Sequence, residues 1–254
     1  MRVTALIAAL AVMFGSGLAG CSHDEPFAHK AAPAQQAATN VQLAIEYMKL
    51  GKLDSSREFV ERALSQDPNN ANVQLTAGLV YERLNEMPKA EKAYSSAARL
   101  GVRDPNIQNN YAGFLCRTGK AVAGEKLFAE VARNPLYQTP EVALVNAGVC
   151  VRSTGDLLDA DRYFNRALAI RPNMPEALLQ LGNVAIDRGD GAVALESVQR
   201  YLAVNPPTPE ILWLGFRAER KLSDVTAAAG FARRVQSEFP NSEQAQMMRA
   251  GIER

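Results

Sequence analysis

Apolar residues recur at helical spacing from residue 37 to the end of the chain, and the pattern repeats at intervals of 34 residues, with one interval of 36. Within each unit two amphipathic helical stretches follow one another, separated by a short polar turn. The pattern predicts an all-α chain with a short capping helix over residues 243–254 and helix–turn–helix repeats over residues 37–70, 71–104, 105–140, 141–174, 175–208 and 209–242.

Three columns of residues recur at fixed places in these units. The first ends the opening helix and needs a left-handed backbone, which Gly and Asn supply. The second, five positions later, is small and lets the paired helices approach closely, and the third is a proline that stops the closing helix. The turn column holds Gly51, Asn85, Gly119, Gly155, Gly189 and Ser223; the small column holds Ser56, Ala90, Gly124, Ala160, Ala194 and Ala228; the closing prolines are Pro68, Pro172, Pro206 and Pro240.

A single repeat of this kind cannot bury both of its apolar faces, so the units must stack on one another. The helix–turn–helix period of 34 residues resembles the tetratricopeptide repeat. We therefore expect a right-handed superhelical solenoid of six such repeats with one continuous core.

The amino terminus follows a different pattern. Arg2 precedes a predominantly apolar run over residues 3–14. As a helix this run would rise roughly 18 Å, which is too short for a hydrocarbon core of about 30 Å. Such a run is typical of a secretory signal peptide, which we place at residues 1–20.

Residues 18–21, Leu-Ala-Gly-Cys, resemble a bacterial lipobox. The resemblance implies that Cys21 carries diacylglycerol and an N-acyl chain, and two or more acyl chains anchor a protein stably. Ser22 follows the cysteine, and in the lipoprotein pattern this implies the outer membrane, on its periplasmic face. Residues 21–36 are rich in Ala, Pro and Gln and are expected to form a flexible tether. Ordinary secretory cleavage that leaves Cys21 unmodified is the alternative.

Charge and histidine content argue against several kinds of function. The 28 Lys and Arg residues nearly balance the 27 Asp and Glu residues, so nothing favours electrostatic binding to nucleic acid. Both histidines, His23 and His29, precede the repeats and leave none there for a metal site or a general base. The repeats also lack a Ser- or Cys-centred catalytic motif and a Gly-rich phosphate loop. We expect a monomeric, non-enzymatic protein that binds protein partners without a metal or other cofactor.

Two cysteines fall late in the first helices of neighbouring repeats, Cys116 in the third and Cys150 in the fourth. The periplasm is oxidising, and adjacent helices can bring Cα atoms to the separation that a disulfide needs. A zinc site would lack further Cys or His ligands, and a nucleophile would lack a basic partner. The sequence predicts a Cys116–Cys150 disulfide, with two reduced buried thiols as the alternative.

The segments around these cysteines carry a more specific resemblance. Residues Asn109–Gly119 match the string N-N-Y-x-x-F-L-C-x-x-G, and residues Pro135–Pro140 match P-L-Y-x-T-P. Both strings resemble the PilF/PilW-like type IV pilus biogenesis/stability lipoproteins. The resemblance implies a pilotin-like role, helping the outer-membrane secretin to localise and multimerise. The alternative is a scaffold lipoprotein of the same fold for another envelope assembly, such as cell-wall enzymes or a different pilus or secretion system.

In tetratricopeptide solenoids the first helix of each repeat lines the concave face, where partners bind. Reading one column after another predicts a groove that is apolar in the first two repeats and becomes polar and basic towards Arg217 and Arg220. An exposed apolar strip marks a partner site more often than chance. The expected groove residues are Val41, Ile45, Met48, Leu75, Leu79, Asn109 and Arg152.

Overall fold

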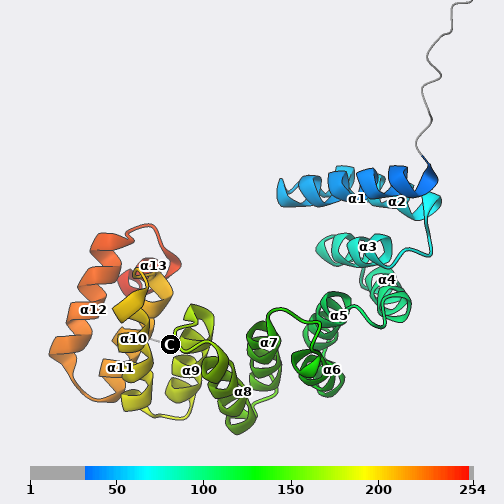
Figure 1. Ribbon diagram of the computed structural model, residues 1–254. Helices are drawn as coiled ribbons and strands as arrows, with labels where there is room; N and C mark the ends of the chain where they lie inside the picture. Colours follow the sequence, from blue (N-terminus) through cyan, green and yellow to red (C-terminus); the bar gives the residue numbers. More distant parts are fainter. Residues whose placement is uncertain (1–31, 252–254) are drawn as a thin grey trace, which may run out of the picture. The chain divides into compact units, whose positions relative to one another are not determined.

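The computed structural model describes residues 32–251, and this part of the chain is entirely α-helical (Figure 1). Cys21 and the predicted signal peptide lie outside the described residues. The helices are α1 (Pro33–Lys49), α2 (Leu53–Gln66), α3 (Ala71–Arg83), α4 (Met87–Leu100), α5 (Pro105–Arg117), α6 (Ala121–Arg133), α7 (Pro140–Arg152), α8 (Leu157–Ile170), α9 (Pro175–Asp187), α10 (Gly191–Val204), α11 (Pro209–Lys221), α12 (Val225–Glu238) and α13 (Glu243–Arg249).

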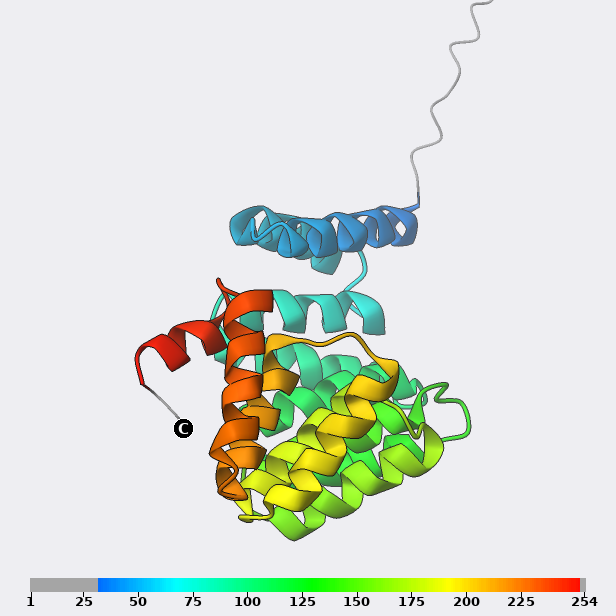
Figure 2. The same cartoon turned by 90° about the vertical axis from the view of Figure 1, so that its left-hand side faces the viewer.

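Consecutive helices from α1 to α12 form antiparallel pairs, and each pair corresponds to one sequence repeat. The short helix α13 follows the last pair and packs against α11 and α12, where the capping helix is predicted (Figure 2). This arrangement confirms the all-α fold of stacked helix–turn–helix repeats. None of the helices within residues 32–251 combines the length and the apolar composition needed to cross a bilayer.

The first helix begins at Pro33, whereas the sequence pattern placed the tether up to residue 36 and the first repeat from residue 37. Proline is favoured at the first position of a helix, and Ala and Gln are good helix formers. The segment therefore becomes helical before its apolar periodicity begins. Ala37, in the second turn of α1, is already fully buried.

The backbone of the turn column agrees with the prediction at every position. Asn85 and Ser223 have φ values of 59° and 64°, and the four glycines of the column are also in the left-handed region. This conformation ends the first helix of each pair and turns the chain into the second. The small column is buried as well, and in the first repeat the Ser56 hydroxyl donates a hydrogen bond of 2.7 Å to the Ala44 carbonyl across the pair.

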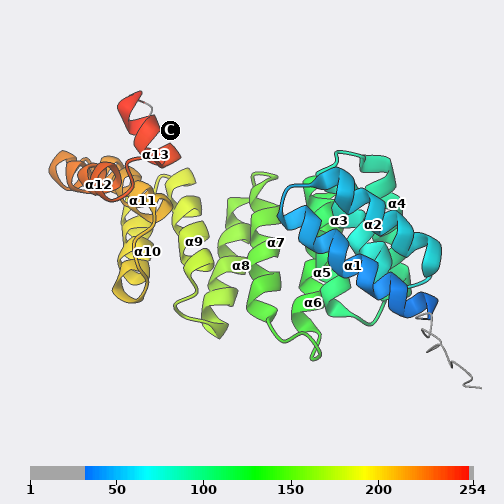
Figure 3. The ribbon, with the colours of Figure 1, turned by 90° about the horizontal axis from the view of Figure 1, so that it is seen from above.

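The odd-numbered helices line the inner face of the stack. Each odd-numbered helix from α1 to α11 contacts the next odd-numbered one, whereas no two even-numbered helices of residues 32–251 contact each other. In a curved stack the helices that lie closer together are on the inside of the curve. Figure 3 shows α5 to α9 side by side, with every second helix belonging to this inner row. Side chains of α1, α3, α5, α7, α9 and α11 that do not enter the core therefore define the candidate binding surface.

Candidate partner-binding groove

A cleft of about 380 Å³ lies between α1 and α3, in the first two repeats. We call it the N-terminal cleft. It contains four of the predicted groove residues, and none of its lining side chains is ionisable. Its lining consists of Ala38, Val41, Gln42, Ile45, Asn70, Asn72, Val73, Leu75, Thr76 and Leu79.

The apolar side chains of the N-terminal cleft also contribute to the core. Val41 is only 8% exposed. Ile45 packs on the small core cluster of α1–α3, and Leu75 and Leu79 pack on the neighbouring cluster around Tyr94. The core packs against these side chains from behind and holds them in place. A partner segment would meet a preformed apolar surface.

Met48 and Asn109 do not belong to this cleft. Met48 is half-buried and packs against the core cluster that contains Tyr94. Asn109 lines a second, polar cleft of about 210 Å³ between α5 and α7, where its Oδ1 accepts a hydrogen bond of 3.4 Å from the Asn146 side chain. The predicted groove is thus divided into two separate clefts. The inner face is mainly apolar in the first two repeats and is lined by amide and arginine side chains at the third repeat.

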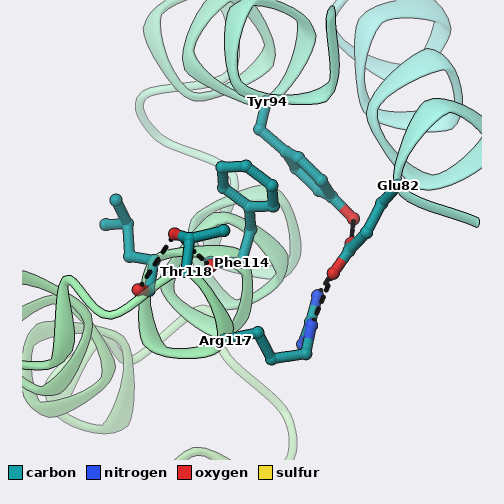
Figure 4. Close-up of polar contacts among 6 residues, drawn as sticks. Glu82, Tyr94, Phe114, Arg117 and Thr118 are labelled. Atoms are coloured by element: carbon teal, nitrogen blue, oxygen red, sulfur yellow. Dashed lines mark hydrogen bonds and ion pairs between the residues drawn. The ribbon is translucent and has the colours of Figure 1, made fainter. Parts of the chain in front are cut away.

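A charged network joins the second and third repeats between these two clefts (Figure 4). Arg117, the last residue of α5, donates hydrogen bonds of 2.6 and 3.0 Å to the two oxygens of Glu82 on α3. The buried Tyr94 hydroxyl on α4 donates a third, of 2.7 Å, to the same carboxylate. The Tyr94 ring stacks on Phe114, with ring centroids 4.6 Å apart. Three helices are therefore tied to one carboxylate.

Protonation equilibria reflect this network. Burial raises the pKa of the Tyr94 hydroxyl, and its hydrogen bond to Glu82 raises it further. Burial alone would raise the pKa of Glu82, but the hydrogen bonds from Arg117 and Tyr94 outweigh it and hold the pKa below its usual value. The carboxylate is therefore ionised in the folded state at pH values where it starts to become protonated in the unfolded chain.

A lowered pKa makes Glu82 a source of acid-sensitive stability. The contribution is present above the unfolded pKa of about 4.3 and is lost as the pH falls through the lower folded value. The Arg117 side chain is 56% exposed, so solvent screening reduces the effect to about 1 kcal/mol. We expect the free energy of unfolding of Glu82→Gln, measured with urea, to be lower than wild type at pH 7 by this amount and to approach wild type at pH 3. An equal difference at both pH values would contradict this account.

Arg152 is less available than the sequence suggested. It ends α7 and donates hydrogen bonds of 2.6 and 2.9 Å to the Asp187 carboxylate at the end of α9. Arg217 on α11 faces the other oxygen of Asp187 at 3.9 Å. This end of the groove is therefore less basic than expected, because the Asp187 carboxylate compensates one of the two positive charges of Arg152 and Arg217.

The two cysteines meet between the third and fourth repeats. Their sulfur atoms lie within bonding distance, and their Cα atoms are 5.5 Å apart. Cys150 is 3% exposed and packs with Ala112 and Phe128 in a small core cluster. Gly124 completes this site: a Cβ atom there would lie 2.3 Å from the Cys116 sulfur. The sequence pattern predicted a small residue at position 124 for close packing of the paired helices, but it did not connect this residue with the cysteines.

The strings that carry the family resemblance have structural roles in this region. Phe114 is buried and stacks on Tyr94, and Tyr137 is buried in a cluster with Val131 and Ala143. Across residues 32–251, no group of three or more His, Cys, Asp or Glu side chains is arranged to hold a metal ion.

The profile of the tetratricopeptide repeat family matches residues 41–106 and 179–243. The chain belongs to the tetratricopeptide repeat family. Along almost its whole length it is also similar to the type IV pilus assembly protein PilF of Pseudomonas aeruginosa, with 22% identity over 246 residues. This alignment covers 96% of this chain and 98% of that protein.

Two solved structures agree with this assignment. The crystal structure of PilW, described as a widely conserved type IV pilus biogenesis factor, superposes with a TM-score of 0.75 at 29% identity, covering 84% of this chain and 98% of that chain. The structure of Pseudomonas aeruginosa PilF gives a TM-score of 0.69 at 20% identity, covering 86% of this chain and 99% of the other. The chain is a PilF/PilW-like tetratricopeptide repeat protein, which confirms the resemblance noted from its sequence.

Proposed function

We propose that this protein acts in type IV pilus biogenesis as a lipoprotein of the outer membrane, where it assists localisation and multimerisation of the pilus secretin. The observation that carries the proposal is its similarity to PilF, which extends over 96% of this chain and 98% of that relative. A repeat protein that shared only the fold would not be expected to match a pilus assembly protein from end to end. The PilW structure, at 29% identity, supports a role in type IV pilus biogenesis.

The lipobox at residues 18–21 supports attachment to the membrane through acylated Cys21. A lipid anchor of two or more chains would hold the repeats at the periplasmic face. It would thereby raise the effective concentration of the repeats near a partner in the same membrane. The oxidising periplasm would also favour the Cys116–Cys150 disulfide for which the cysteines are positioned.

The N-terminal cleft is our candidate for the contact with the secretin. It is the apolar part of the inner face, and it lies in the two repeats that directly follow the membrane-proximal segment of the sequence. The absence of ionisable groups in its lining favours an uncharged segment that carries apolar side chains. Such a segment could be an amphipathic helix or an extended peptide.

Deletion and complementation test the proposal. A strain without this protein is expected to lose surface pili and to have little multimeric secretin in its outer membrane, as seen by electron microscopy and by immunoblotting of outer-membrane fractions. The wild-type gene should restore both. Normal pili and normal secretin multimers in the deletion strain would refute the proposed function.

Cys21→Ala tests the anchor separately. We expect this variant to incorporate no radiolabelled palmitate, to fold as the wild-type repeats do and to restore pili poorly, because its repeats are no longer held at the outer membrane. Wild-type protein that takes up no label would rule out lipidation while leaving the pilus role open.

A further inference from the structure

Consecutive repeats are joined along one edge of the stack. Because the paired helices are antiparallel, every odd-numbered helix from α1 to α11 begins at this edge and every even-numbered helix ends there. We call it the joining edge, and its connections are residues 67–70, 101–104, 134–139, 171–174 and 205–208. Four of these connections contain, or directly follow, an aliphatic side chain that is more than half exposed. These side chains are Val102, Leu136, Ile170 and Val204, which follow one another at intervals of 34 residues.

Packing does not explain these exposed side chains. Leu136 belongs to the string P-L-Y-x-T-P, in which its neighbour Tyr137 is buried in a cluster with Val131 and Ala143, whereas Leu136 itself is 67% exposed. Single exposed aliphatic residues are common on protein surfaces. A row of them along one edge, at the period of the repeats, is typical of an interaction surface.

Arginine side chains accompany this row between α4 and α9. They are exposed, and none makes a hydrogen bond or an ion pair within residues 32–251: Arg99 in the last turn of α4, Arg103 before α5, Arg133 at the end of α6 and Arg171 directly after α8. Three carboxylates begin the helices that follow. Asp104 caps α5, Glu176 accepts a hydrogen bond of 2.8 Å from the Gln180 side chain, and Glu141 has no partner within the described chain. Four arginines against three carboxylates leave this part of the edge weakly basic.

The chain enters the first repeat at the joining edge. In Figure 3 the beginning of α1, at Pro33, and the connection between α6 and α7 lie on the same side of the stack. Residues 22–32, which link Cys21 to α1, can span at most roughly 40 Å. The opposite edge, where the left-handed turns lie, is farther along the chain by the length of α1, about 25 Å for its 17 residues. An acyl anchor on Cys21 therefore favours the approach of the joining edge to a bilayer.

We propose that the joining edge docks on the phospholipid surface of the membrane that holds the anchor. The four aliphatic side chains enter the headgroup region, where burial of apolar area favours binding. The exposed arginines match phosphate oxygens with their planar N–H groups, while their aliphatic stems lie along the apolar row. Docked in this way, the inner helices point away from the bilayer and the groove opens sideways, towards a partner in the same membrane.

This inference rests on the proposed function for the anchor at Cys21, and it adds the orientation of the repeats. The anchor alone holds the chain near the membrane without selecting one face of it. A second, weak contact along the joining edge supplies that selection, because the anchor raises its effective concentration at the surface.

Tryptophan quenching tests which edge meets the lipid. A maleimide phospholipid is coupled to the Cys21 thiol of the mature chain, made without its signal peptide, so that anchoring does not depend on natural acylation. The vesicles contain phosphatidylethanolamine and phosphatidylglycerol with brominated acyl chains. The emission of Leu136→Trp should shift to shorter wavelength and be quenched. Leu158→Trp is the matched control, because Leu158 is 66% exposed near the start of α8, at the opposite edge; its emission should stay as it is in water.

Two further substitutions in the Leu136→Trp chain show whether the neighbouring aliphatic residues hold the edge on the lipid. Val102→Glu with Ile170→Glu should abolish the quenching, because a carboxylate is not expected to enter an anionic headgroup region. Val122→Glu with Val225→Glu adds the same charge to exposed side chains of the opposite edge and should leave the quenching unchanged. The native Trp213, which is 7% exposed, contributes a background that the unsubstituted chain measures, and circular dichroism verifies folding.

Equal quenching of Leu136→Trp and Leu158→Trp, or quenching of neither, would overturn the docking. So would quenching of Leu136→Trp that persists in the folded chain with Val102→Glu and Ile170→Glu. A strain with Leu136→Glu that loses its pili, although Leu136→Trp is not quenched by lipid, would assign the edge to a protein partner instead. The vesicles contain no secretin and the anchor is supplied chemically, so this result is independent of palmitate labelling and of the deletion experiment, which test the proposed function.

Discussion

Chains with Ile45→Glu or Leu79→Glu are expected to fold and reach the membrane but to leave the secretin unassembled and the cell without pili. Both side chains line the N-terminal cleft, where no lining residue is ionisable. Each apolar side chain that a partner buries there could contribute roughly 1.5–3 kcal/mol before ordering costs. A carboxylate in the same place would lose its water without gaining a partner, which costs several kcal/mol. The expected effect is near-complete loss of secretin multimers.

Because Ile45 and Leu79 also pack on the core, folding must be measured by circular dichroism alongside assembly. A second variant avoids the core: Gln42→Trp adds bulk at an exposed residue of the cleft lining and should block the partner by steric exclusion alone. The matched control is Val122→Glu, which places the same charge on a side chain that is 82% exposed on α6 and outside the cleft. Normal pili in folded Ile45→Glu, Leu79→Glu and Gln42→Trp strains would remove the N-terminal cleft from the mechanism.

The repeat architecture could be predicted because its determinants are local. A left-handed turn residue, a small residue five positions later and a closing proline each act within one helical hairpin, and the structure has positive φ at all six turn positions. The start of the first helix was harder to predict. Pro33 and the alanines after it form a helix through intrinsic propensity, without the apolar periodicity that marks the other repeats.

The candidate site was predictable only in part, because it depends on contacts between repeats. Columns of equivalent residues correctly indicated Val41, Ile45, Leu75 and Leu79 as neighbours. They did not reveal that Asp187 would pair with Arg152, since these residues occupy positions that differ by one in their repeats. Repeats that stack with a twist are also displaced along their helix axes. A comparison of equivalent positions in the repeats ignores this displacement. An arginine at the end of the first helix of one repeat, followed by an aspartate at the end of the first helix of the next repeat, could have indicated this ion pair.

Mature protein from the periplasm is expected to contain the Cys116–Cys150 bond, and its reduction should lower the free energy of unfolding by about 3–4 kcal/mol in the chain-entropy treatment, for a sequence separation of 34 residues. In a chain of this size the melting temperature should fall by roughly 5–15 °C. Thermal unfolding with and without reductant measures the shift. Two cysteines that react with a thiol reagent in denaturant, without reductant, would show that the bond is absent.

Gly124 provides an independent check of the same site. Four other repeats carry Ala in this column, but at Gly124 a Cβ atom would lie 2.3 Å from the Cys116 sulfur and 2.8 Å from the Ala112 carbonyl oxygen. We expect Gly124→Ala to cost about 1–3 kcal/mol through overpacking. In a chain that already carries Cys116→Ala and Cys150→Ala, the sulfur is gone and only the carbonyl contact opposes the new methyl group, so the same substitution should cost less. A double-mutant cycle by urea denaturation measures this coupling, and strictly additive effects would show that glycine is not required there by the cysteine.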